Sequence, residues 1–233
     1  QILTDGGVNN KVLDCLGRHM PFWDREIELV ILTHPDKDHF RGLIEVFQRY
    51  RVDNFLYNGL KSGSHEYQVL ENEVGGGGTK TIAAREGTVL GVGKIRLDIL
   101  SPTEEQLASL PTKIMEKNEY SIVTILSLDN FDALLTGDVE NEAADNLADG
   151  ITTMKNKTIE YIKVPHHGSK NGLTQKLLEA VVPKLAVISV GNNSYGHPNG
   201  EVIKLLNSKG IKTLRTDEIG DVEVISDGEE TSY

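Results

Sequence analysis

The chain has 233 residues, which is enough for one large domain or two small ones. Its formal net charge is −11, and such an acidic surface argues against broad, non-specific binding to nucleic acid, because cationic contacts to phosphates supply most of that affinity. The single cysteine, Cys15, excludes an internal disulfide framework, and no apolar run approaches the ~20 residues of a bilayer-spanning helix.

Apolar runs of strand length recur along the chain and predict β-strands. They cover residues 29–32, 55–57, 95–100, 122–128, 133–135, 161–164, 186–190 and 222–225. Helical periodicity between these runs predicts amphipathic helices, whose apolar stripes fall within 43–47, 173–181 and 202–206. Strands that alternate with helices indicate an α/β fold with helices packed against sheets. The mixed patterns near residues 95 and 122 predict that some of the pairing is antiparallel.

We predict a single domain over residues 1–233, because no segment has the composition of a domain linker. The chain starts with Gln1, and the next two residues are typical of the end of a strand. We therefore expect that it lacks a preceding N-terminal strand. The glycines from Gly75 to Gly78 lack the strand and lysine context of a phosphate-binding loop, so they predict a surface loop.

The segment 29–39 carries the densest potential chemistry. A predicted buried strand leads directly into four potential metal ligands within six residues, namely His34, Asp36, Asp38 and His39. Pro35 favours an extended residue before it, so that a tight loop lets these side chains converge. Without a cation, the clustered carboxylates would repel one another in a buried place. We therefore predict a metal site here.

This segment resembles the HxHxDH signature of the metallo-β-lactamase superfamily, in the variant HxDxDH. Three further stretches match one branch of that superfamily: 134–138 resembles the strand that ends in the bridging aspartate, 163–169 the VPHHGS motif, and 189–198 the SxGxxNxYGHP motif. With the segments 5–7 and 215–217, these motifs are similar to the metallo-β-lactamase-like domain of the DNA-uptake competence protein ComEC and its stand-alone relatives. The resemblance spans nearly the whole chain.

The resemblance implies an αββα sandwich, in which two mixed sheets are flanked by helices. It also implies a site for two divalent ions, held by His34, Asp36, Asp38, His39, Asp138 and His167. A mixture of imidazoles and carboxylates suits Zn²⁺, Mn²⁺ or Fe²⁺ and is too rich in nitrogen for Ca²⁺. We expect Zn²⁺ or Mn²⁺. A hydroxide on such metals, formed because the pKa of bound water falls toward ~7, is a nucleophile at neutral pH.

Further roles follow from the same motifs. Asp38, His166 and His197 are the predicted catalytic residues. The sequence leaves open which of His166 and His167 is the metal ligand. We expect His197 to act as a proton donor to the leaving group or to bind the phosphate. Lys170 and Asn192 are predicted to bind substrate. His19, His65 and Trp23 match no motif. We expect the two histidines on the surface, and Trp23 in the core or in a packing contact rather than as a platform for base stacking.

Two departures separate the chain from the antibiotic-hydrolysing members. Asp36 stands where they have a histidine, and residues 118–121 occupy the region of their third-motif histidine without supplying one. We therefore expect a metal-dependent phosphodiesterase, plausibly a nuclease acting on single-stranded DNA. The alternatives are a hydrolase of another small ester or lactone, and a metal-stabilised binding module without turnover. The compartment and the oligomeric state stay open.

Overall fold

The computed structural model describes residues 1–108, 117–154 and 158–233. This part of the chain divides into two compact units. The N-terminal unit holds residues 1–85 and Lys117, and the C-terminal unit holds residues 86–108, 118–154 and 158–233. Within the described residues, no helix has the combined length and apolarity that crossing a bilayer requires.

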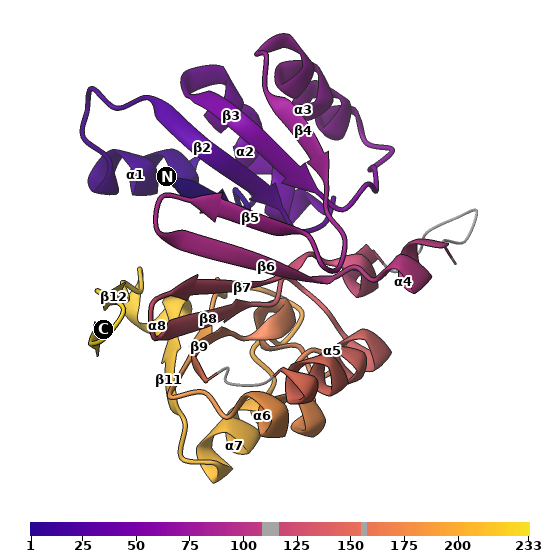
Figure 1. Ribbon diagram of the computed structural model, residues 1–233, viewed down its shortest axis with the longest axis vertical. Helices are drawn as coiled ribbons and strands as arrows, with labels where there is room; N and C mark the ends of the chain where they lie inside the picture. Colours follow the sequence, from indigo (N-terminus) through magenta and orange to yellow (C-terminus); the bar gives the residue numbers. More distant parts are fainter. Residues whose placement is uncertain (109–116, 155–157) are drawn as a thin grey trace. The chain divides into compact units, whose positions relative to one another are not determined.

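The N-terminal unit is a parallel sheet with helices between its strands (Figure 1). Its sheet has the order β1-β2-β3-β4, and all three pairings are parallel. The strands are β1 (Ile2–Thr4), β2 (Glu26–Leu32), β3 (Arg51–Tyr57) and β4 (Lys80–Ala83), and the connecting helices are α1 (Lys11–His19), α2 (Lys37–Arg49) and α3 (His65–Gly76). The apolar stripe of α2, with Phe40, Leu43 and Val46 all buried, packs in one core with Ile27 and Val30 of β2. Because β1 and β2 are parallel neighbours, the loops after them meet at one edge of the sheet.

The C-terminal unit contains a seven-stranded sheet of order β11-β10-β9-β8-β7-β6-β5. The strands β5 (Val89–Val92), β6 (Ile95–Ser101), β7 (Val123–Leu128) and β8 (Phe131–Leu135) pair antiparallel. The strands β8, β9 (Ile159–Lys163), β10 (Leu185–Ile188) and β11 (Lys212–Arg215) pair parallel. A separate two-stranded ribbon is formed by β12 (Ile225–Ser226) and β13 (Thr231–Ser232).

The parallel half of this sheet is connected through helices. These helices are α5 (Asn141–Thr153), α6 (Gln175–Val181) and α7 (Gly200–Ser208), and the 3₁₀ turn η2 (Pro165–Gly168) precedes α6. The short helix α4 (Glu104–Ala108) and the 3₁₀ turn η1 (Lys117–Tyr120) lie between β6 and β7 in the sequence, and the short helix α8 (Thr216–Ile219) follows β11. The helices α5, α6 and α7 lie on one side of the sheet (Figure 1) and share a core with its strands. The loops after β8, β9 and β10 therefore open at one edge, and these loops carry the last three sequence motifs.

The predicted fold class is confirmed, since helices flank several sheets of an α/β chain. The C-terminal sheet is mixed, whereas the pairings of the N-terminal sheet are all parallel. The predicted strand at 222–225 is wrong except for its last residue, because this polar tail forms only the two-residue β12. The predicted loop at Gly75–Gly78 is half wrong: Gly75 and Gly76 continue α3, and only Gly78 takes a positive φ, of 75°.

Gly42 in α2 permits a close approach between that helix and the loop after β1. A Cβ built on Gly42 would lie 2.0 Å from the carbonyl oxygen of Gly6 and 2.6 Å from that of Asn9. The Gly42 amide donates to the carbonyl oxygen of Gly7 at 2.9 Å. This contact fixes the loop that carries Asp5.

We expect Gly42→Ala to lower the free energy of unfolding by about 1–3 kcal/mol, because its methyl group forces two backbone segments apart. Gly75→Ala is the matched control: it also lies in a helix, but its added Cβ meets nothing within 4 Å. There, alanine should stabilise by about 0.5 kcal/mol through its helix propensity. Urea unfolding of both variants checks the pair, and equal behaviour would show that the close approach is not required.

Candidate metal centre

Two buried histidines form the centre of the N-terminal cluster. The rings of His34 and His39 lie 4.0 Å apart between centroids, and their exposed fractions are 1% and 3%. His34 follows β2 in the loop, while His39 sits in the first turn of α2. The loop between them therefore brings the two imidazole rings into contact, which is the convergence that the motif predicts.

The Nδ1 atom of each of these imidazoles has a partner in the same unit. His39 Nδ1 lies 2.7 Å from Asp5 Oδ2, which also accepts from Thr33 Oγ1 at 2.8 Å. Thr33 Oγ1 lies 3.1 Å from His34 Nδ1, so its oxygen can accept that hydrogen. With the protons on Nδ1, both imidazoles keep the Nε2 lone pair for a metal.

Asp5 lies in the motif segment 5–7, from which the sequence assigned it no role. In the structure its carboxylate contacts His39 and Thr33. Besides the two contacts above, its Oδ1 accepts from the Thr33 amide at 2.8 Å. Burial alone raises the pKa of Asp5, but the charge and hydrogen bond of His39 and the Thr33 amide outweigh burial and lower it. The carboxylate is therefore charged and holds the His39 ring in place.

Asp36 and Asp38 present carboxylate oxygens to the Nε2 side of the two histidines. His34 Nε2 lies 3.7 Å from Asp36 Oδ2, and His39 Nε2 lies 3.9 Å from Asp38 Oδ2. The other Asp36 oxygen, Oδ1, accepts from Lys117 Nζ at 2.6 Å. Sequence reasoning missed Lys117, because 81 residues separate it from its partner.

Asp138 is the centre of the C-terminal cluster, and it is 2% exposed. Its Oδ2 lies 3.3 Å from His167 Nε2 and 4.0 Å from His166 Nε2. Its Oδ1 lies 3.3 Å from Lys163 Nζ, which also donates to the carbonyl oxygen of Gly137 at 2.8 Å. One carboxylate oxygen thus faces the histidines and the other faces a lysine.

The two consecutive histidines turn toward Asp138 through unusual backbone angles. Their φ values, 43° for His166 and 52° for His167, lie in the left-handed region. His166 Nδ1 lies 2.7 Å from Glu140 Oε1, and His167 Nδ1 lies 2.6 Å from the carbonyl oxygen of Ser189. With the proton of each neutral ring on Nδ1, both Nε2 atoms would direct a lone pair toward Asp138. In this unit, either histidine has the orientation of a ligand.

Glu140 sets the ionisation of His166. Burial lowers the pKa of His166. The Glu140 hydrogen bond and the negative charge of Asp138 raise this pKa by more than burial lowers it, so the net shift is upward. Glu140 also accepts from Ser169 Oγ at 2.9 Å. A carboxylate behind an imidazole is a common second partner of metal-binding histidines. The sequence motif contained Ser169, but gave no sign of Glu140.

The donor atoms in each cluster fit a divalent metal. Ligands with bonds of about 2.0–2.2 Å to one ion lie roughly 3–4 Å from one another. The four Nε2-to-oxygen separations given above, 3.3, 3.7, 3.9 and 4.0 Å, fall in this range. Imidazole nitrogen with carboxylate oxygen is the donor set of Zn²⁺, Mn²⁺ or Fe²⁺.

His197 lies next to the C-terminal cluster, with its ring centroid 5.4 Å from that of His166. Burial lowers the pKa of His197, and the neighbouring His166 and His167 lower it further, so the neutral ring is favoured. Its Nδ1 is buried and accepts or donates no hydrogen bond among the described residues. Pro198, which follows His197, packs closely on the turn at Gly168. A Cβ at Gly168 would lie 2.7 Å from Pro198 Cβ, so this contact requires glycine.

The remaining predicted residues lie on the surface. Lys170 is exposed and pairs with Glu201 at 3.2 Å, and Asn192 is exposed in the loop after β10. His19 and His65 are exposed, as expected. The prediction that Trp23 lies in the core is wrong: it is 72% exposed and packs only edge-on against Phe22 in the loop before β2.

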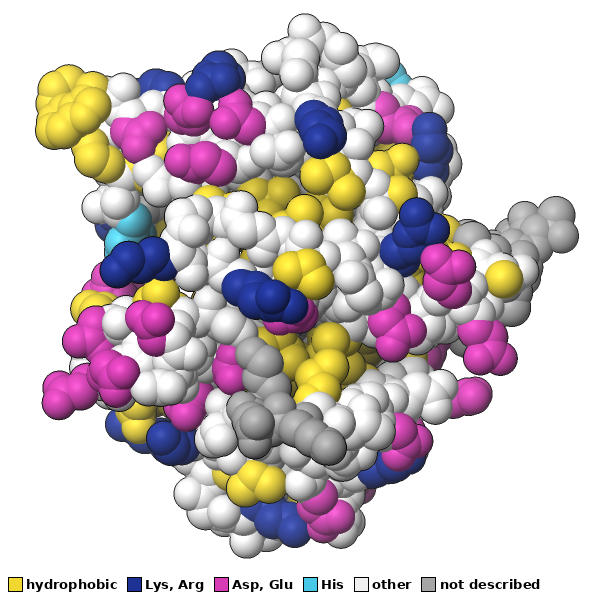
Figure 2. All heavy atoms as spheres, in the orientation of Figure 1, with side chains coloured by type: hydrophobic (Ala, Val, Ile, Leu, Met, Phe, Trp, Pro, Cys, Tyr) yellow, Lys and Arg dark blue, Asp and Glu magenta, His cyan; other side chains and the backbone are white. Residues whose placement is uncertain are grey.

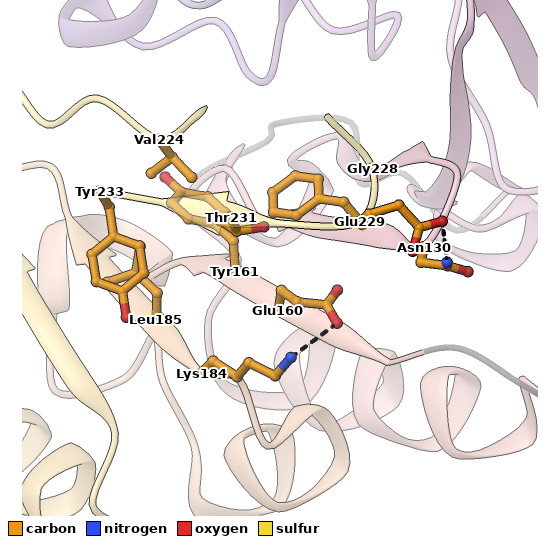
Figure 3. Close-up of a pocket in the computed structure, with 11 residues that line it drawn as sticks. Asn130, Glu160, Tyr161, Lys184, Leu185, Val224, Gly228, Glu229, Thr231 and Tyr233 are labelled. Carbon is orange, nitrogen blue, oxygen red and sulfur yellow. Dashed lines mark hydrogen bonds and ion pairs between the residues drawn. The ribbon is translucent and has the colours of Figure 1, made fainter. Parts of the chain in front are cut away.

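A cavity of about 180 Å³ lies elsewhere in the C-terminal unit (Figure 3). None of the motif histidines or aspartates lines it. Its polar side chains pair with one another, Lys184 with Glu160 at 3.6 Å and Asn130 with Glu229 at 2.9 Å. The charged side chains that line the cavity thus already have partners among the lining residues.

The chain belongs to the metallo-β-lactamase superfamily, whose family profile matches residues 24–192. ComE operon protein 3 of Bacillus subtilis is 29% identical over 85% of the chain, and competence protein ComA of Neisseria gonorrhoeae is 28% identical over 83%. The expected similarity to competence proteins is thus confirmed. The chain spans about a quarter of the length of these relatives, 24% of each.

The fold is also shared with solved structures. Tm1679, a metal-dependent hydrolase of the β-lactamase superfamily, matches with a TM-score of 0.58 at 13% identity, over 93% of this chain and 86% of that one. Zn²⁺-bound PqqB of Methylobacterium extorquens matches with a TM-score of 0.53 at 11% identity, over 90% and 80%. At these identities, the likeness concerns the fold alone.

We expect Asp5→Ala to lower the free energy of unfolding by about 1–3 kcal/mol, because the Thr33 amide and the buried His39 Nδ1 lose their acceptor. Zn²⁺ affinity should fall by roughly 10- to 100-fold as the His39 ring loses its orientation. Asp5→Asn keeps an acceptor oxygen and should recover part of both losses. Urea unfolding and competitive chelator titration measure the two effects, and an unchanged Zn²⁺ affinity in Asp5→Ala would refute the positioning role.

Proposed function

We propose that the chain is a metal-dependent hydrolase of phosphodiesters, with DNA as the substrate. The observation that supports it most is the geometry of four imidazoles, each with Nδ1 beside a fixed partner and Nε2 beside a carboxylate oxygen. Membership of the superfamily agrees with hydrolysis. The similarity to competence proteins supports DNA as the substrate.

The proposed metal ligands are those that the sequence indicates: His34, Asp36, Asp38, His39, Asp138 and His167. Two divalent ions bound by them would supply an activated water at neutral pH and positive charge for the attacking and leaving oxygens. Asp5 and Glu140 keep their histidines oriented. Lys163 holds the second oxygen of Asp138, so that Oδ2 is the oxygen offered to a metal.

The main alternative is a hydrolase of a small ester or lactone. The formal net charge of −11 supports keeping it, because a nuclease is expected to carry Lys and Arg contacts to phosphates beside its site. On the face drawn in Figure 2, the described Lys and Arg side chains are interspersed with Asp and Glu. A binding module without turnover is the third candidate.

A screen of the metal-reconstituted protein separates these candidates. Its substrates are bis-p-nitrophenyl phosphate, single- and double-stranded DNA, a lactone, and nitrocefin, each with Zn²⁺, with Mn²⁺ and with a chelator. We expect metal-dependent cleavage of the phosphodiesters. Turnover of the lactone alone would replace the proposal with the second candidate, and metal binding without any turnover would replace it with the third.

Asp38→Ala should abolish most hydrolysis and leave the fold largely intact, because Asp38 is half-exposed and contributes little to the core. Loss of a metal ligand removes several kcal/mol of transition-state stabilisation, or about 10²–10³ in rate. Asp14→Ala, which removes an exposed aspartate of α1, is the control and should be fully active. His39→Ala is a poorer test of chemistry, since it also leaves the buried Asp5 carboxylate without its imidazole. Near-normal turnover of metal-loaded Asp38→Ala would show that the chemistry is misplaced.

His197→Ala should lower turnover on DNA by roughly 10²- to 10⁴-fold if the ring protonates the leaving alkoxide. The loss should be much smaller on bis-p-nitrophenyl phosphate, whose leaving group departs without a proton. His197→Gln distinguishes the two roles, because glutamine donates a hydrogen bond but transfers no proton. Activity of His197→Gln near that of the wild type would assign hydrogen bonding to the phosphate, in keeping with the lowered pKa of His197. Loss of bound metal in either variant would assign His197 to the coordination shell.

A further inference from the structure

Tyr195 presents an aromatic ring to solvent beside the C-terminal cluster. It is 83% exposed, although a side chain of this size and apolarity is usually at least half-buried. Its ring stacks on that of His197, with centroids 6.1 Å apart and an interplanar angle of 23°. The tyrosine ring thus lies nearly parallel to that of His197, and most of its side chain is open.

Asn193 holds this loop in a defined shape. Its Oδ1 accepts from the amides of Tyr195 at 3.1 Å and of His197 at 3.0 Å. Its Nδ2 donates to the carbonyl oxygens of His197 at 2.8 Å and of Gly191 at 2.9 Å. The side-chain amide thereby ties both ends of the turn together. An aromatic ring on such a turn is ordered before a ligand arrives, so less conformational entropy is lost on binding.

The far end of the loop is anchored as well. Pro198 packs on the turn at Gly168, and the Asn199 amide donates to the Gly168 carbonyl oxygen at 2.8 Å. Asn199 also begins α7, where its Oδ1 accepts from the Glu201 amide at 2.9 Å. The loop that carries Tyr195 is therefore fixed to the same turn that positions His166 and His167.

The rings form a short series that leads to the proposed chemistry. Tyr195 stacks on His197, the His197 ring lies 5.4 Å from that of His166, and His166 Nε2 lies 4.0 Å from Asp138 Oδ2. A base stacked on the open side of Tyr195 is separated from Asp138 by at most these three steps, the width of the His166 ring and one stacking distance. It would therefore lie within a few nucleotides of a phosphodiester at Asp138.

We propose that Tyr195 is a nucleobase-stacking residue, which selects single-stranded nucleic acid with an unstacked base within a few nucleotides of the phosphodiester that is cleaved. Base–aromatic stacking contributes about 1–3 kcal/mol per base and tolerates any base, because every base has a π face. Bases inside a duplex are stacked on one another and do not reach this ring. The inference rests on the proposed phosphodiesterase function and adds to it the residue that would select a single strand.

The test measures binding of a single-stranded thymidine oligonucleotide with phosphorothioate linkages, which resist cleavage, and of an abasic oligonucleotide with the same backbone. Tyr195→Ala should raise the Kd for the thymidine oligonucleotide by about 5- to 150-fold, the range that corresponds to the stacking energy. Tyr195→Phe and Tyr195→Trp keep a ring and should bind as the wild type does. Wild type and Tyr195→Ala should bind the abasic oligonucleotide with similar, weak affinity.

Phe22→Ala is the matched control, because Phe22 is also 83% exposed but lies in the loop before β2. It should leave the Kd unchanged. The inference is overturned if Tyr195→Ala binds the thymidine oligonucleotide as tightly as the wild type does. It is also overturned if Phe22→Ala is equally weakened, or if Tyr195→Phe loses as much as Tyr195→Ala.

Cleavage assays on the same proteins keep this result separate from the proposed function. If the wild type cleaves DNA and Tyr195→Ala has an unchanged Kd, the stacking role alone fails. If the wild type shows ring-dependent binding but hydrolyses no phosphodiester with Zn²⁺ or Mn²⁺, hydrolysis fails and the stacking role stands. If the wild type neither binds nor cleaves any oligonucleotide, both are rejected.

Discussion

The hydrogen bond on Nδ1 of each cluster histidine is the interaction on which the candidate centre depends. An imidazole can offer Nε2 to a metal only when its proton is on Nδ1 and its ring cannot rotate. The chain meets this need with three kinds of partner: a carboxylate for His39 and for His166, a hydroxyl for His34, and a backbone carbonyl for His167. Because the partners differ, no single sequence pattern marks them.

These hydrogen bonds in turn require the topology of the two sheets. Asp5 reaches His39 because β1 and β2 are parallel neighbours, so the loops after them open at one edge. Ser189 reaches His167 for the same reason, since β9 and β10 are parallel neighbours. The close approach at Gly42 adds a steric requirement to this arrangement. A packing change at Gly42 would therefore shift the loop that carries Asp5 and, through Asp5, the ring of His39.

The proposed ligands could be named from the sequence because they cluster locally. Four of the six lie between His34 and His39, directly after an apolar strand. The partners Asp5, Lys117 and Glu140 were not predictable as such, since each acts across 26 to 81 residues and only the fold brings it to its target. Trp23 was misassigned because a single aromatic residue without periodic neighbours does not show which way it points. The short β11 and helix α3 were missed because their apolar patterns are weak.

The charges around the proposed ligands give a reason for the two lysines. In the N-terminal unit, Lys117 donates to Asp36 at 2.6 Å, beside the further carboxylates of Asp38 and Asp5. In the C-terminal unit, Lys163 lies 3.3 Å from Asp138, which has the further carboxylate of Glu140 nearby. Each lysine thereby reduces the repulsion among the clustered carboxylates of its own unit. If the proposed metals bind, the carboxylates that the lysines offset neutralise less of the metal charge, and more of that charge is left for an anionic substrate.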